Sequence, residues 1–138
     1  MTKISTVGVV GAGTMGNGIA QVFAQAGFDV RLQDVAQGAL DRARASIEKS
    51  LGKFVEKGKL QAADRDQTLT RLRVTTDFDA LSEADYVVEA IVEDETAKRD
   101  LFRRLDARTR PGVILTSNTS SISITRLAAS TTRPDRVL

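Results

Sequence analysis

The sequence contains no cysteine and no histidine. Without cysteine the chain can form neither disulfides nor thiolate metal sites, and it offers no thiol nucleophile. Without histidine it lacks the side chain that most often acts as a general base near neutral pH. We therefore expect no metal site, and we expect any base-dependent reaction to need a residue from outside these 138 residues.

Other absences narrow the setting of the protein. No apolar run is long enough to span a bilayer, and no charged and then apolar leader ends in a small-residue cleavage site. The net charge of +2 is too small to indicate a nucleic-acid binder. With 41% hydrophobic and 28% charged residues, the chain has the composition of one soluble domain. We expect a cytoplasmic protein without membrane or nucleic-acid partners.

The stretch from Ile4 to Asp34 predicts a strand, a helix and a second strand. A buried strand ends at Val10 and runs into a G-x-G-x-x-G motif, made of Gly11, Ala12, Gly13, Thr14, Met15 and Gly16. The helix that follows has an expected inward face of Ile19, Val22, Phe23 and Ala26. Gly27 ends this helix, and the second strand ends at Asp34.

Each feature of this unit has a physical role in holding a dinucleotide. Gly11 makes the tight turn, Gly13 leaves room for a pyrophosphate, and Gly16 lets helix and strand approach closely. The free amides of the helix N-terminus favour the diphosphate. Asp34 is placed to accept hydrogen bonds from the adenosine ribose, and its charge would repel the 2′-phosphate of NADP. The motif therefore predicts NAD; the alternative is another α/β fold in which Asp34 caps a helix.

Residues 35–73 predict a basic helical hairpin. The first helix has an apolar stripe and is expected to end near Gly58, and a second helix over 64–72 turns Leu69 and Leu72 inward. The stripe comprises Leu40, Ala43, Ile47, Leu51, Phe54 and Val55. Interleaved acids favour a solvated helix face, whereas the excess of lysine and arginine allows a docking surface for a polyanion.

The rest of the chain predicts further strands at 74–76, 86–91 and 113–115, and a last one that begins at 136–138. With the intervening helices they indicate a Rossmann-type, doubly wound parallel sheet of order 3-2-1-4-5-6, into which the basic hairpin is inserted. The acids at 93–95 suit a helix N-terminus. The polar run 116–121 follows a buried strand, so it either faces a ligand at the carboxyl edge or caps a helix.

Three segments together resemble the NAD-binding domain of the 3-hydroxyacyl-CoA dehydrogenases, in particular the bacterial 3-hydroxybutyryl-CoA type. They read GVVGAGTMGNGIAQVFAQAGFDVRLQD, VVEAIVEDETAKRDLF and ILTSNTSSISIT. The resemblance implies that Glu93, Lys98 and Asn118 line the nicotinamide side of NAD. It also implies that Ser120 is a catalytic serine, which bonds the 3-oxygen of the substrate and touches the cofactor. Ser50 and Lys57 match positions that contact coenzyme A.

The resemblance further implies an NAD-dependent oxidoreductase of fatty-acid and butanoate metabolism, which interconverts short-chain 3-hydroxyacyl-CoA and 3-oxoacyl-CoA. In that family the strand begun by 136–138 leads to a His-Phe-Phe-Asn-Pro motif, whose histidine is the general base. A helical domain follows and forms the acyl pocket and the homodimer interface. We expect residues 1–138 to be the NAD-binding Rossmann domain alone, able to bind NAD but inactive.

Two alternatives stay open at this stage. One is another NAD-linked enzyme of the β-hydroxyacid type, which an assay with free acids in place of coenzyme A thioesters would distinguish. The other is a stand-alone nucleotide-binding or redox-sensing domain without catalysis. The reading frame beyond Leu138 separates that second alternative from the dehydrogenase.

Overall fold

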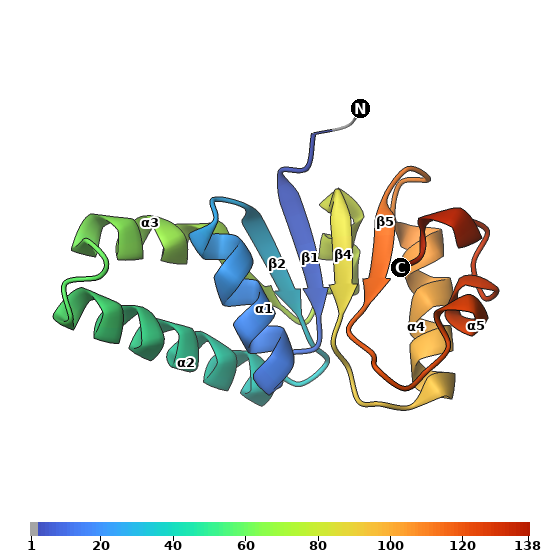
Figure 1. Cartoon of the computed structure of the whole chain (residues 1–138), viewed down its shortest axis with the longest axis horizontal. Coiled ribbons are helices and arrows are strands. Elements are labelled where there is room, and N and C mark those ends of the chain that lie inside the picture. Colours follow the sequence, from blue (N-terminus) through green and yellow to red (C-terminus); the bar gives the residue numbers. More distant parts are fainter. Residues whose placement is uncertain (1–2) are drawn as a thin grey trace.

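The computed structural model describes residues 3–138, and within them five parallel strands form one sheet in the order β3-β2-β1-β4-β5 (Figure 1). The prediction of a doubly wound parallel sheet is confirmed. The strands are β1 (Thr6–Val10), β2 (Asp29–Gln33), β3 (Leu72–Thr75), β4 (Tyr86–Glu89) and β5 (Ile114–Ser117). The helices are α1 (Thr14–Gln25), α2 (Gln37–Glu56), α3 (Ala62–Arg71), α4 (Glu95–Arg108) and α5 (Ile124–Ala128), with 3-10 turns η1 (Phe78–Glu83) and η2 (Pro134–Arg136).

Two apolar clusters lie on either side of the sheet. One joins β1 and β2 to α1 and α2, and the other joins β4 and β5 to α4 and α5 (Figure 1). Because both faces of the central strands are covered, Val7 and Val9 of β1 are fully buried, as is Val87 of β4. No helix among residues 3–138 has the length and apolar character needed to cross a membrane.

The inward face of α1 differs from the prediction. The buried residues are Gly16, Ala20 and Ala24, whereas Val22 is 66% exposed. Small side chains let the helix lie close to the sheet, and the larger apolar residues lie on the side of the helix next to this buried face. Ile19 and Phe23 are partly buried there, and Ala26 is exposed. Spacing alone could not decide between these two neighbouring stripes, because both repeat every three to four residues.

The basic hairpin forms as two helices, and the buried stripe of α2 contains Leu40, Ala43, Ile47 and Leu51 as predicted. Phe54 and Val55 are only partly buried, and Gly58 adopts φ 70° just after the helix. The second helix was placed too far along the chain. Leu72 begins β3 instead, where it pairs with Val30, so its burial comes from the sheet and not from a helix face.

The last expected strand is reduced to one bridge. Arg136 closes η2, and Val137 makes a parallel bridge with Leu115. The backbone amide of Leu138 donates to Leu115, and its carbonyl accepts from Ser117. Val137 therefore lies beside β5, at the position that a sixth strand occupies in the predicted order.

Candidate functional site

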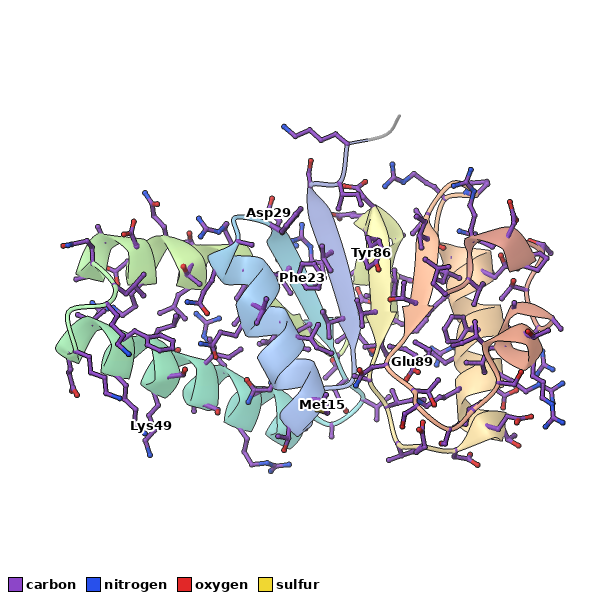
Figure 2. The ribbon with its side chains drawn as sticks, viewed as in Figure 1. Met15, Phe23, Asp29, Lys49, Tyr86 and Glu89 are labelled. Atoms are coloured by element: carbon purple, nitrogen blue, oxygen red, sulfur yellow. The ribbon has the colours of Figure 1, made fainter. Side chains whose placement is uncertain are left out.

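Four loops meet at the carboxyl edge of the sheet. All five strands are parallel, so the loops that follow β1, β2, β4 and β5 leave the sheet at the same edge (Figure 1). Figure 2 shows Met15, which follows β1, and Glu89, which ends β4, at this edge. The structure thus brings the predicted glycine motif, Asp34, Glu93 and the run 116–121 to one side of the molecule.

The glycine motif fits a ligand that approaches the backbone. Gly11 has φ 106°, and a Cβ there would meet the carbonyl oxygen of Ala90 at 2.5 Å. A Cβ on Gly16 would overlap the carbonyl group of Gly11. A Cβ on Gly13, by contrast, would have no neighbouring atom of the described residues within 4 Å. Gly13 caps α1 without a side-chain hydrogen bond, and the first turn holds no acid, so its amides suit an anion.

Asp34 has bonds that the motif did not predict. One carboxylate oxygen accepts the backbone N–H of Ala12 at 2.8 Å, and the other accepts that of Ala36 at 2.9 Å. The N-cap of α2 is Ala36, so Asp34 does not take the capping role of the alternative interpretation. Each carboxylate oxygen can accept a second hydrogen bond, which leaves capacity for ribose hydroxyls. Asp34 therefore also ties the glycine loop to β2.

A cavity of about 230 Å³ lies between Asp34 and the start of α4. Its walls are mostly apolar, and the Arg104 guanidinium closes one side by stacking 4.0 Å from the centre of the Phe78 ring. Such a slot suits a flat, apolar-faced group such as a nucleobase. Sequence reasoning missed its lining, which includes Val35, Phe78, Ile91, Ala97 and Arg104.

A buried ion pair lies under the loop after β4. The Lys98 ammonium is 2.7 Å from a carboxylate oxygen of Glu89 and 2.9 Å from one of Glu93. Glu89 is fully buried and Lys98 is 1% exposed, whereas the Glu93 side chain is 43% exposed. The Glu89 carboxylate also accepts the hydroxyl of Ser117 and the backbone N–H of Ile91. Every oxygen of the buried carboxylate therefore has a donor.

Glu93 connects the loop after β4 to the loop after β5. Its second carboxylate oxygen accepts the hydroxyls of Thr119 at 2.8 Å and Ser121 at 2.9 Å. The hydrogen bond from Lys98, followed by those from the two hydroxyls, lowers the pKa of Glu93 to about 2. The helix N-terminus is capped instead by Asp94, which accepts from Ala97. Glu93 is thus a bridge between two loops.

The polar run after β5 divides into engaged and free side chains. Thr116 donates to Val87, Ser117 to Glu89, and Thr119 and Ser121 to Glu93. Within residues 3–138, the side chains of Asn118 and Ser120 make no hydrogen bond, and both residues are exposed. The N-cap of α5 is Ser123, so the run does not serve as that cap. Asn118 and Ser120 are left for a ligand.

The family comparison covers nearly all of the chain. The model of the family described as "3-hydroxyacyl-CoA dehydrogenase, NAD binding domain" matches residues 6–138. The chain belongs to this family.

Similar proteins agree with this assignment. A probable 3-hydroxybutyryl-CoA dehydrogenase of Deinococcus radiodurans is 54% identical over 127 residues, which are 92% of this chain and 45% of that protein. A 3-hydroxybutyryl-CoA dehydrogenase of Clostridioides difficile is 45% identical, over 94% of this chain and 46% of its own length. The crystal structure of (S)-3-hydroxybutyryl-CoA dehydrogenase PaaH1 from Ralstonia eutropha superimposes with a TM-score of 0.95 at 44% identity, over 98% of this chain and 48% of that one. The chain spans about half the length of these relatives.

Membership of the NAD-binding domain family confirms the prediction of NAD as cofactor. The individual contacts stay predictions, and the geometry supports them unequally. Gly13, Asp34 and Asn118 present free groups or open space at the carboxyl edge. Lys98 is 1% exposed, and its ammonium is paired with both Glu89 and Glu93. Only the third N–H of that ammonium is therefore left for a ribose. No group of three or more acidic side chains in residues 3–138 is arranged to hold a metal ion.

The two residues expected to contact coenzyme A lie apart from the carboxyl edge: Ser50 is on α2, and Lys57 directly follows it. The Ser50 hydroxyl accepts a hydrogen bond from Gln21 of α1 at 2.9 Å. Lys57 follows α2 and is exposed, and no ion pair within residues 3–138 involves it. Seven residues separate them, which is about two helical turns, so both face the same side of α2.

Proposed function

We propose that the chain is the NAD-binding domain of an NAD-dependent dehydrogenase that interconverts 3-hydroxyacyl-CoA and 3-oxoacyl-CoA. The observation that carries this proposal is the family match over residues 6–138, since the segments after β1, β4 and β5 that form the site all fall inside it. The relatives named 3-hydroxybutyryl-CoA dehydrogenase favour a short acyl chain such as hydroxybutyryl. A cytoplasmic enzyme of fatty-acid or butanoate metabolism fits this reaction.

The cofactor would lie along the carboxyl edge. The open space at Gly13 and the amides of α1 suit the pyrophosphate, and Ala12, Thr14 and Met15 would contact it from the same turn. Asp34 would accept hydrogen bonds from the hydroxyls of the adenosine ribose, and adenine would lie in the neighbouring cavity. Glu93, Lys98 and Asn118 would then line the nicotinamide half. When bound, NAD supplies the acceptor for the hydride from C3 of the substrate.

The substrate would be held by groups on two elements. The free hydroxyl of Ser120 would bond the 3-oxygen, and Ser50 and Lys57 would hold coenzyme A, whose phosphates attract an unpaired lysine. The 138 residues include no histidine, so we propose that the base comes from a further segment of the enzyme. We also propose a helical domain in that segment, which completes the acyl pocket and forms a homodimer.

Binding measurements on the NADH-loaded chain test the substrate class. The chain should bind a 3-oxoacyl-CoA such as acetoacetyl-CoA, whereas free acetoacetate should bind at least about tenfold more weakly, because it lacks the phosphates that Lys57 would contact. Lys57→Ala should weaken the thioester about fivefold, in keeping with one exposed charge contact of roughly 1 kcal/mol. Incubated with NAD and 3-hydroxybutyryl-CoA, the 138-residue chain should form no NADH.

Lys3→Ala is the matched control, because it removes the same charge just before β1, at the opposite edge of the sheet. Isothermal titration calorimetry gives the affinities. Equal binding of thioester and free acid, or equal weakening by the two lysine variants, would contradict the coenzyme A assignment. Steady NADH formation would contradict the external base.

A further inference from the structure

Glu89 is a buried carboxylate for which the sequence suggested no role beyond a place in a strand. It ends β4, where it pairs with Val10 of β1 on one side and with Ser117 of β5 on the other. Figure 2 shows it at the edge of the sheet from which the loops emerge. A charge at 0% exposure is costly unless it is fully paired and hydrogen-bonded.

Glu89 bonds to each of the segments that carry the predicted nicotinamide contacts. Its side chain accepts the ammonium of Lys98 at 2.7 Å, from α4. It also accepts the N–H of Ile91 at 2.9 Å, in the loop that leads to Glu93. On β5 it accepts the hydroxyl of Ser117, and its backbone carbonyl accepts the N–H of Asn118 at 2.9 Å. One residue thus fixes three segments relative to one another.

Stability alone does not account for this arrangement. Replacing a buried ion pair by well-packed apolar residues is often neutral or stabilising. A second ion pair of α4, between Asp106 and the 7% exposed Arg133, ties down Thr132 and Arg133 away from the carboxyl edge. The Glu89 pair differs because it lies at the cofactor edge, and because the Lys98 ammonium has three donors. Two of them point to Glu89 and Glu93, and one is left over.

We propose that Glu89 is a positioning residue for the cofactor: it holds Lys98 in place so that the remaining donor of Lys98 meets the nicotinamide ribose. This proposal rests on the role of the carboxyl edge as the NAD site. Glu89 itself does not bond the cofactor, because both oxygens of its carboxylate already accept hydrogen bonds from Lys98, Ser117 and Ile91. Its effect on NADH binding therefore passes through Lys98.

A double-mutant cycle on NADH affinity, measured by fluorescence titration, tests this coupling. Glu89→Gln keeps the shape of the side chain but removes its charge, and it should weaken NADH binding about tenfold. Lys98→Met should weaken it to a similar extent. In the Lys98→Met background, Glu89→Gln should change the affinity by less than about threefold, since the residue through which Glu89 acts is already gone.

Asp106→Asn is the matched control, because it breaks the other buried ion pair of α4. It should lower the Tm while leaving NADH affinity unchanged. Glu89→Asp is a milder variant, which keeps the charge but shortens the side chain. It should still lower the affinity for NADH several-fold, because the Lys98 ammonium shifts with the carboxylate to which it is paired. The proposal would be overturned if either Glu89 variant folds and binds NADH as tightly as the parent. It would also be overturned if the double variant loses as much NADH affinity as the product of the losses in Glu89→Gln and Lys98→Met. If the parent chain itself does not bind NADH, the proposed NAD site is wrong. If the parent binds NADH and the Glu89 variants bind it equally well, only the proposed role of Glu89 is wrong.

Discussion

At the scale of single residues, Gly13 and Gly16 lack a side chain for different reasons. A Cβ on Gly16 would lie 2.7 Å from the carbonyl carbon of Gly11, so this glycine is needed for the fold itself. Around Gly13 the space is open and φ is −74°, which any residue can adopt. Gly13 therefore matters for what binds, whereas Gly16 matters for how the chain packs.

This difference predicts opposite outcomes for two alanine substitutions. Gly13→Ala should cost less than about 1 kcal/mol of stability, since the only penalty is that alanine is a poorer N-cap than glycine. It should nevertheless lower the affinity for NADH at least about tenfold, because its Cβ occupies the space of the pyrophosphate. Gly16→Ala should prevent stable folding. Urea unfolding and NADH fluorescence titration measure both effects.

Gly18→Ala serves as the reference, because no atom of the described chain lies within 4 Å of its Cβ position and it lies on the outer side of α1. It should stabilise the chain by about 0.5–1 kcal/mol without changing NADH affinity. A Gly13→Ala variant that binds NADH like Gly18→Ala would show that the cofactor does not approach this turn.

The residues that the sequence identified are those whose role depends on local spacing. The glycines and Asp34 stand in a fixed order along one stretch, so their shared edge could be predicted. The bonds of Asp34 to Ala12 and Ala36 could not, because they depend on how two loops meet. Glu89 was missed because its partner Lys98 lies on another element, although a glutamate that ends an apolar strand is itself a signal.

At the scale of elements, the hydrogen bonds of Glu93 join the loop after β4 to the loop after β5, and this bridge depends on pH. Glu93 has a pKa of about 2 against an ordinary 4.5, so its stabilising contribution is complete above pH 4.5 and is lost as the pH falls towards 2. The parent should therefore have a higher Tm than Glu93→Gln at pH 7. This difference should shrink between pH 4.5 and pH 2.

Differential scanning calorimetry across this range measures the effect. The pKa of Asp85 is also lowered, mainly by hydrogen bonds from the backbone of Thr6 and the side chain of Arg110. At Asp106 burial raises the pKa, but hydrogen bonds from Thr132 and Arg133 outweigh it, so the pKa is lowered there too. Because these groups titrate in both proteins, only the difference between parent and variant reports on Glu93. A difference that stays constant down to pH 2 would show that the carboxylate does not hold the two loops together.

The elements themselves could be predicted in kind better than in orientation. The strands of the sheet and the helices of the hairpin follow from apolar runs and helical spacing. The face of α1 could not be assigned, since the sheet selects Ala20 and Ala24 for their small size over the more apolar Val22. Leu72 belongs to β3 because pairing with Val30 overrides the helical pattern before it.

At the scale of the whole molecule, cofactor binding should raise the stability of the entire fold. The predicted contacts come from loops after four different strands, so unfolding must release the ligand. NADH at a hundred times its Kd adds about 2.7 kcal/mol to the free energy of unfolding. For a domain of this size that corresponds to a rise in Tm of roughly 5–10 °C.

The same measurement tests the choice between the two nicotinamide cofactors. NADPH at equal concentration should raise the Tm of the parent by much less, because the Asp34 carboxylate repels the 2′-phosphate. Asp34→Asn should bring the two shifts together: its amide oxygen can still accept the N–H of Ala12 and so hold the glycine loop, at the loss of the bond from Ala36, while the repulsion is gone. Equal shifts with NADH and NADPH in the parent would show that Asp34 serves only to hold the glycine loop, and that this domain does not select NAD over NADP.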